Sequence, residues 1–283
     1  MTPQQYCKEK TAKSGSSFTV SFIFLDKIKR EAMTALYAFC REVDDVVDEC
    51  TDYNVAQTKL NWWKNEIDRL YDNKPQHPVS FALQPVIKQF DLAKEHFHEI
   101  IDGMEMDLRF NRYADFKQLQ LYCYRVASVV GLLSAQIFGY QNRNTLKFAH
   151  DLGMAFQLTN IVRDVGEDAR RGRIYLPLDE LKKAKVSEED ILSSNKTPEV
   201  KELIEFQIER AESFYDKALR ELPSEDAKQQ RAGLMMAAIY RTLLREIQAD
   251  GAENVLTHKT AIPPFRKLIL ALKAFFKYSY THV

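Results

Sequence analysis

The sequence predicts an all-α protein that forms one domain over residues 1–283. Its 9 glycines and 9 prolines make up about 6% of the 283 residues, whereas soluble proteins usually contain about 12%. These are too few turn-forming residues for a fold built from many short strands. Long stretches instead repeat apolar residues at the spacing of three and four that favours helices. A hydrophobic content of 45% is enough for a core, and no internal repeat or linker divides the chain.

The apolar periodicity predicts the elements in turn. A polar entry segment over residues 1–17 ends in Ser14-Gly15-Ser16-Ser17, which is typical of a helix cap and also of an anion-binding turn. Residues 73–78 (NKPQHP) form the clearest loop, and residues 263–283 predict a last helix docked on the core. The lysines of that tail leave a helix resting on a bilayer surface as the alternative. The remaining helices are expected over residues 29–50, 55–72, 79–90, 94–110, 115–138, 144–170, 198–220 and 225–249.

Two of these helices carry unusual residues. Gly103 lies among Asp102, Glu105 and Asp107, and both close packing and passage of a ligand explain a glycine inside a helix. Small side chains in the 115–138 helix would allow a neighbouring helix to approach closely, or would leave room for a long apolar ligand. These small residues are Ala127, Ser128, Gly131, Ser134 and Ala135.

Charge and cysteine content exclude several classes of protein. The 40 basic and 40 acidic residues give a formal net charge of +0, so we expect no nucleic-acid partner and no global attraction to an anionic membrane. The polar N-terminus predicts no secretory signal, and we expect no transmembrane helix. A cytoplasmic protein with reduced thiols is predicted, with peripheral contact to the inner membrane face left open. The four cysteines, Cys7, Cys40, Cys50 and Cys123, show no C-x-x-C spacing.

Polar side chains form one stripe on each of two predicted helices. At 100° per residue, members of a stripe point in nearly the same direction. Both stripes are flanked by Val, Ile, Phe and Met, so their carboxylates lie next to a core, where an unpaired charge is costly unless it holds a cation. The alternative is a solvated helix face with salt bridges along the helix. One stripe contains Tyr37, Arg41, Asp44 and Asp48, and the other contains Gln157, Asn160, Asp164 and Asp168.

Paired aspartates one helical turn apart predict a magnesium site. Asp44 with Asp48, and Asp164 with Asp168, supply the hard oxygen ligands that Mg²⁺ prefers. Because Mg²⁺ completes its octahedron with water and phosphate oxygens, a substrate diphosphate is the expected third partner. The neutral amides of the second stripe can bind metal or diphosphate without adding repulsion. Forked donors for phosphate oxygens are offered by Arg41, Arg163 and Arg173.

Three runs carry a resemblance to a known family. YAFCREVDDVVDE, YCYRVASVVG and GMAFQLTNIVRDVGEDARRGRIYLP resemble the squalene and phytoene synthase family, and the likeness extends from Ser14 to the tail. The last run is most similar to bacterial presqualene diphosphate synthases. The resemblance implies a single isoprenoid synthase domain, with helices around a deep central cavity into which both aspartate-rich helices point.

The resemblance also implies roles for individual residues. The metal ligands would be Asp44, Asp48, Asn160, Asp164 and Asp168, holding two or three Mg²⁺ ions. Substrate would be bound by Arg41, Gln157, Asn160, Arg163, Arg173 and Tyr240, with Ser14 and Ser17 near the entrance. Tyr37, Tyr124 and Tyr240 would lie near the reacting carbons, where an aromatic face stabilises a cation. Where relatives often carry an arginine before a valine, this chain has Asn254 before Val255, so Lys259 or Arg266 is expected to replace that cation.

The implied reaction is head-to-head condensation of two molecules of farnesyl diphosphate to presqualene diphosphate. No NADPH is expected for this step, since no G-x-G-x-x-G run follows a predicted strand. Three alternatives stay open: phytoene synthesis from geranylgeranyl diphosphate, synthesis of dehydrosqualene or squalene, and a non-catalytic assembly protein of the same fold. A monomer or a weak homodimer is expected.

Overall fold

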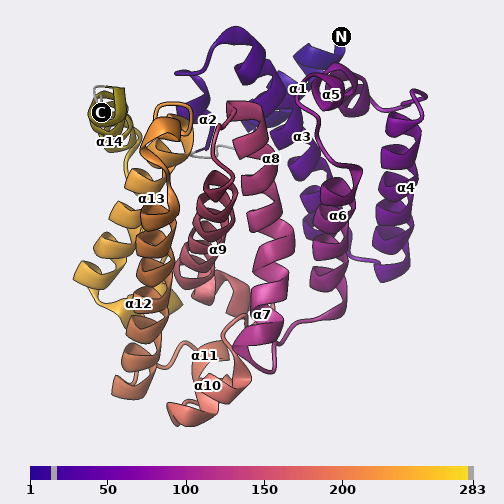
Figure 1. Ribbon diagram of the computed structural model, residues 1–283. Helices are drawn as coiled ribbons and strands as arrows, with labels where there is room; N and C mark the ends of the chain where they lie inside the picture. The colour runs from indigo at the N-terminus through magenta and orange to yellow at the C-terminus, as the bar shows by residue number, and fades with distance from the viewer. Residues whose placement is uncertain (14–17, 280–283) are drawn as a thin grey trace.

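The computed structural model describes residues 1–13 and 18–279, and within these ranges it is built from helices (Figure 1). Its β pairing there is limited to one isolated parallel bridge between Arg112 and Ile174. The all-α prediction is therefore confirmed. The helices are α1 (Pro3–Lys13), α2 (Phe18–Phe22), α3 (Lys27–Glu49), α4 (Tyr53–Tyr71), α5 (Pro78–Gln89), α6 (Lys94–Arg109), α7 (Phe116–Cys123), α8 (Val129–Phe138), α9 (Asn144–Arg170), α10 (Leu178–Lys183), α11 (Glu188–Leu192), α12 (Pro198–Glu221), α13 (Arg231–Asp250) and α14 (Pro264–Ser279).

Local sequence signals explain where several helices begin. The Asp26 carboxylate accepts a hydrogen bond from the Lys29 amide at 3.0 Å and caps α3. Asp52 and Asp115 cap α4 and α7 in the same way, and Thr197 caps α12. Each of these side chains satisfies a backbone amide that the first helical turn leaves unpaired.

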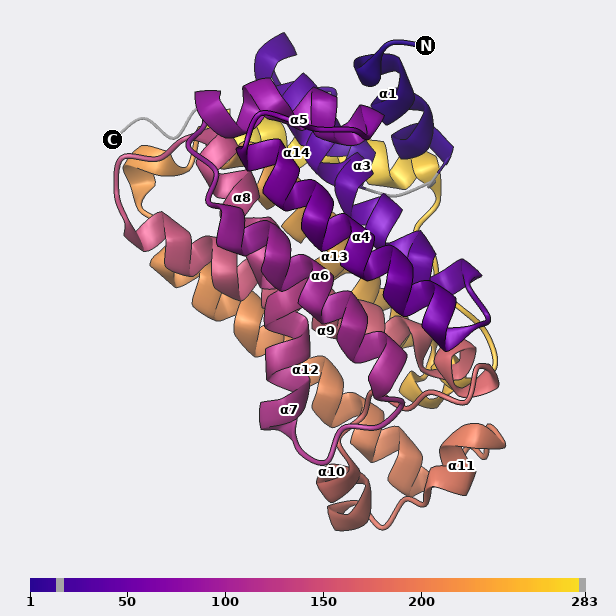
Figure 2. The same cartoon turned by 90° about the vertical axis from the view of Figure 1, so that its right-hand side faces the viewer.

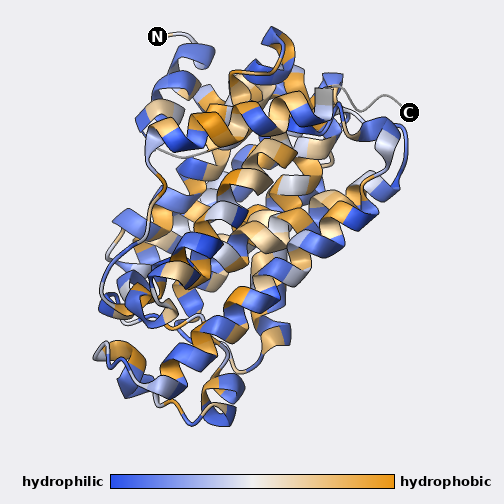
Figure 3. Ribbon diagram, turned by 90° about the vertical axis from the view of Figure 1, so that its left-hand side faces the viewer, coloured by the Kyte–Doolittle hydropathy of each residue, from blue (hydrophilic) through white to orange (hydrophobic). Residues whose placement is uncertain are grey.

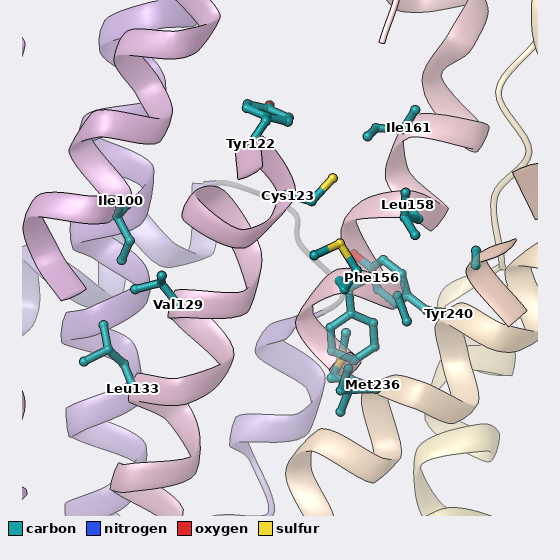
Figure 4. Packing of buried hydrophobic residues seen from close by; sticks show 14 of the residues in the cluster. Ile100, Tyr122, Cys123, Val129, Leu133, Phe156, Leu158, Ile161, Met236 and Tyr240 are labelled. Atoms are coloured by element: carbon teal, nitrogen blue, oxygen red, sulfur yellow. The ribbon is translucent and has the colours of Figure 1, made fainter. Parts of the chain in front are cut away.

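The long helix α9 is the centre of the bundle. It packs against α8, α12 and α13, and Figure 1 shows it between α8 on one side and α12 and α13 on the other. Apolar residues concentrate in the middle of the bundle (Figure 3), and Val129 and Leu133 of α8 point toward Ile100 of α6 (Figure 4). The α4 helix lies at one edge of the bundle beside α6 (Figure 1), and the two helices run side by side on the face turned toward the viewer in Figure 2.

Glycines allow α9 to approach its neighbours closely. A methyl group added at Gly153 would lie 2.6 Å from the Ser128 Cα atom and 2.7 Å from the Ala127 carbonyl oxygen. One added at Gly131 would lie 2.5 Å from the Ala149 carbonyl oxygen. Close helix approach therefore explains part of the small-residue pattern in the 115–138 stretch.

The structure differs from the predicted elements in several places. The 115–138 helix contains a π-helical turn, Tyr124–Ser128, between α7 and α8. The entry segment contains a helix, α1, and two short helices, α10 and α11, follow α9. These elements were missed because their apolar residues are too few to show a period.

The structure also bears on two other expectations, one about membrane-spanning helices and one about the C-terminal tail. Contrary to expectation, the helical stretch over residues 116–138 is long and apolar enough to cross a bilayer by length and composition. It packs against α6 and α9, which accounts for its apolar character as a helix of the bundle core. The tail forms α14, which docks on α13 and α2 with Ala271 and Ala274 buried.

Candidate active site

The two polar stripes face one cavity of about 690 Å³. Asp44 and Asp48 lie near the C-terminal end of α3, and Asp164 and Asp168 lie near the C-terminal end of α9. The predicted residues that line the cavity are Tyr37, Arg41, Asp44, Asp48, Gln157, Asn160, Arg163, Asp164, Asp168, Arg173 and Tyr240. Residues from helices more than 100 positions apart in the chain thus form one site.

Basic side chains pair with the acids of both stripes. Arg41 contacts Asp44 and also its neighbour Asp45. Arg163 donates from Nε to the Asp164 carboxylate at 2.8 Å. Lys259 Nζ lies 2.9 Å from the same carboxylate and 2.8 Å from Glu167. Arg171, which the stripes did not indicate, lies 3.4 Å from Asp48. Within residues 1–13 and 18–279, no three acidic, histidine or cysteine side chains already converge on one metal position.

The oxygen donors nevertheless fit a hard cation. The Asn160 Oδ1 atom is buried and has no hydrogen-bond partner among the described residues, while its Nδ2 donates to Gln157 at 3.3 Å. Burial raises the pKa of Asp44 to about 7, and the nearby Asp48 adds to the rise. Burial, reinforced by Asp164, also raises the pKa of Asp168 to about 7. A bound cation would relieve both the desolvation and the repulsion.

A further carboxylate, the half-buried Asp107 of α6, joins the site. It accepts hydrogen bonds from the Tyr175 hydroxyl at 2.7 Å and the Tyr122 hydroxyl at 2.9 Å. Burial raises the pKa of Asp107 to about 6, although these hydrogen bonds oppose the rise. Asp107 lines the cavity, whereas Asp102 and Glu105 pair with Lys64 on the side toward α4.

Tyr124 does not lie where the resemblance placed it. It is absent from the cavity lining, and its ring packs against His150 with the ring centroids 5.8 Å apart. Tyr122 lines the cavity instead. Positions two apart on a helix point about 200° away from each other, so only one of these two tyrosines can face inward. The sequence pattern did not indicate Tyr122 or Tyr175, and it marked Asp107 only as an acid near Gly103, because the hydrogen bonds of this cluster join three separate elements.

Aromatic rings form another part of the wall. The rings of Phe156 and Tyr240 lie 5.1 Å apart, and both contact Phe18. Tyr37 stacks on Phe18 at 6.3 Å. Figure 4 shows Phe156, Tyr240 and Met236 gathered between α9 and α13. Such a cluster combines an apolar surface with π faces that attract a cation.

The remaining predicted residues have different outcomes. Lys259 lines the cavity, as expected of a substitute for the missing arginine. Arg266 does not line the cavity and pairs instead with Glu246 of α13, so that alternative is wrong. Ser14 and Ser17 lie outside the described residues.

The carboxylates and the far part of the cavity are separated along α9. Asp164 and Phe148 both line the cavity and are 16 residues apart, or about 24 Å at 1.5 Å per residue. The buried side chains of Met33, Phe138 and Phe148 form the part remote from the acids. The cavity therefore has a polar end and a long apolar end.

Comparison with known proteins relates this arrangement to a family. A model of the squalene/phytoene synthase family matches residues 11–266. Phytoene synthase 1 of Solanum lycopersicum is 35% identical over 269 residues, which cover 93% of this chain and 65% of that protein. The 15-cis-phytoene synthase of Synechococcus elongatus is 34% identical over 277 residues, covering 93% and 89% of the two chains.

Solved structures show the same fold. A dehydrosqualene synthase in complex with a ligand superposes with a TM-score of 0.87 at 28% identity, covering 98% of this chain and 97% of that one. Squalene synthase HpnC of Alicyclobacillus acidocaldarius gives a TM-score of 0.79 at 27% identity, with 88% and 94% covered. The predicted all-α isoprenoid synthase architecture is thereby confirmed. With its matching family model and its two acidic helices facing one cavity, the chain belongs to the squalene/phytoene synthase family.

Proposed function

We propose that this protein condenses two molecules of farnesyl diphosphate head to head to form presqualene diphosphate. The observation that carries the proposal is the convergence of two aspartate-rich helix ends at the polar end of a long apolar cavity. A diphosphate fits the polar end, and an isoprenoid chain fits the apolar end. The names of the two similar solved structures, dehydrosqualene synthase and squalene synthase, support the C15 substrate.

The acidic residues would hold two or three Mg²⁺ ions. Asp44 and Asp48 would bind from α3, while Asn160, Asp164 and Asp168 would bind from α9. Bound Mg²⁺ would neutralise charge on the leaving diphosphate and so assist cleavage of the allylic C–O bond. The basic residues that pair with the aspartates, Arg41, Arg163 and Lys259, reach the same region. They can turn from carboxylates to phosphate oxygens when the diphosphate enters.

The apolar wall would control the carbon chemistry. Ionisation of one farnesyl diphosphate leaves an allylic cation, which the 2,3 double bond of the second molecule attacks. Loss of a proton then closes a cyclopropane ring, and the second diphosphate is retained in the product. The rings of Tyr37, Phe156 and Tyr240 would stabilise positive charge, and the apolar surroundings would keep water from capturing the cation.

Phytoene synthesis from two molecules of geranylgeranyl diphosphate is the second candidate. The curated relatives named phytoene synthase, at 34% and 35% identity, favour it. The bulky side chains of Met33, Phe138 and Phe148 favour the shorter substrate, because they occupy the part of the cavity that the longer isoprenoid chain of geranylgeranyl diphosphate would enter. A non-catalytic assembly role is disfavoured because both acidic motifs are complete.

A product assay separates these candidates. Purified protein with Mg²⁺ is incubated with farnesyl diphosphate or with geranylgeranyl diphosphate, with and without NADPH, and products are identified by mass spectrometry. We expect presqualene diphosphate from the first substrate without NADPH. Phytoene as the main product would support the second candidate. Turnover of neither substrate would contradict both, and squalene formed only with NADPH would contradict the one-step assignment.

A further inference from the structure

The C-terminal helix α14 has apolar residues on two opposite sides. Ala271 and Ala274 are buried where the helix docks on the bundle. On the other side Phe265, Leu268 and Phe276 are 74%, 42% and 54% exposed. At 100° per residue these three exposed side chains fall within a sector of about 80°. A helix that only covered a core would need one apolar side, so the second side is available to a partner of its own.

Basic side chains lie beside the exposed apolar side. Residues 264–279 contain four basic residues and no acidic residue, although the whole chain has a formal net charge of +0. Arg266 pairs with Glu246, and Lys267 lines the cavity. Lys273 and Lys277 are exposed and lie about 80° and 120° around the helix from Phe265. Phenylalanine and leucine flanked by lysine form the pattern of a helix that rests in a lipid headgroup region.

A neighbouring turn extends the same surface. The Phe24 ring packs on Phe275 of α14, with the ring centroids 5.1 Å apart. This contact brings the turn after α2 next to α14, and Ile23 in that turn is 65% exposed. Exposed apolar residues from two segments therefore lie at one end of the bundle, where Figure 1 places α14 and α2.

We propose that this surface, defined by Ile23, Phe265, Leu268 and Phe276 with Lys273 and Lys277, docks on an anionic lipid bilayer. The apolar residues of this surface favour an apolar partner, and its two lysines favour a negatively charged one. A second copy fits poorly, because a two-fold interface would bring the lysines of this patch against each other. Lys267 lines the cavity from the side of α14 that faces the bundle, so a protein docked through the opposite side of α14 would hold its apolar cavity close to the bilayer.

Vesicle flotation tests the proposal with the full chain and without any turnover, so its outcome is independent of the proposed function. Vesicles of phosphatidylcholine alone are compared with vesicles that also contain phosphatidylglycerol. We expect binding to the anionic vesicles and much weaker binding to the neutral ones. The double variant Phe265→Ser/Phe276→Ser should lower the partition coefficient at least about tenfold, because two phenyl rings lose an apolar environment. Lys273→Gln/Lys277→Gln should weaken binding to anionic vesicles about fivefold per lysine.

A matched control and two contrary outcomes complete the test. Phe110 is 50% exposed and lies after α6, outside the patch, so Phe110→Ser should bind vesicles like the wild type. Thermal unfolding by circular dichroism should be unchanged in the patch variants, because their altered side chains are exposed. The proposal is overturned if the wild-type protein does not float with anionic vesicles, or if Phe110→Ser loses as much binding as the phenylalanine pair. It is also overturned if sedimentation shows a lipid-free dimer that Phe265→Ser/Phe276→Ser dissociates.

Discussion

Replacing Gly153 with alanine should destabilise the protein, although alanine is the better helix former. The new methyl group would lie 2.6 Å from Ser128 Cα and 2.7 Å from the Ala127 carbonyl oxygen. Both are backbone atoms of the π-helical turn, so no side chain can rotate away. Overpacking of a core costs about 1–3 kcal/mol, and we take the upper value because the clash is with backbone. Subtracting the gain of about 1 kcal/mol in helix propensity leaves a net loss of about 2 kcal/mol.

Thermal unfolding monitored by calorimetry measures this loss. At roughly 2–4 °C per kcal/mol for a chain of this size, Tm should fall by about 4–8 °C. Gly233→Ala is the matched control, because its methyl group would meet Leu152 Cδ2 at 3.4 Å, an ordinary contact. It should raise stability by about 0.5–1 kcal/mol through helix propensity alone. If both variants shift Tm equally, close backbone approach is not the reason for glycine at position 153.

Three further predictions concern charges and hydroxyls. Asp164→Asn should lower turnover about a hundredfold with little change in Tm, since it removes ligand charge and little packing; steady-state kinetics with undiminished turnover would contradict its role. Tyr175→Phe should cost about 1–3 kcal/mol in denaturant unfolding because Asp107 loses a donor. Tyr113→Phe is its control, since the buried Tyr113 hydroxyl has no partner among the described residues, and an equal loss would argue against the hydrogen bond. Burial opposes ionisation of Asp151, but hydrogen bonds from His150 and Lys217 outweigh it and lower the Asp151 pKa. A lowered pKa stabilises the fold above the unfolded value of about 4, so Asp151→Asn should destabilise at pH 7. The difference should shrink as the pH falls below 4, and a difference independent of pH would refute this.

The polar stripes could be predicted because helical periodicity is local. Tyr37 and Asp48 share a face for the same geometric reason in any straight helix, and the apolar residues around them indicate burial. That the second stripe faces the same cavity came from the resemblance, since no spacing relates residue 48 to residue 164. Lys259 and Arg266 were both candidates for the missing cation. Only the packing in the structure separates them, because Lys259 pairs with Asp164 of α9, whereas Arg266 pairs with Glu246 of α13.

The Asp107 cluster could not be predicted from the pattern. Its hydroxyl donors stand 15 and 68 residues away along the chain, on α7 and on the segment after α9. No helical period relates residues 107, 122 and 175. Tyr122 lies near the end of α7, the helix that precedes the π-helical turn, so its position also depends on that helix. Asp107 itself was noticed only as one acid near Gly103, where packing and function were both open interpretations.

The ion pairs of the site imply that metal and diphosphate bind together. Arg163 and Lys259 both contact Asp164, so Mg²⁺ bound there without diphosphate would leave two cations beside a neutralised carboxylate. Diphosphate bound without Mg²⁺ would attract the same cations away and leave the aspartates unpaired near the core. Each ligand therefore removes the electrostatic cost that the other creates, and such coupling must be reciprocal. A site built in this way favours Mg²⁺ and diphosphate bound together over either one bound alone.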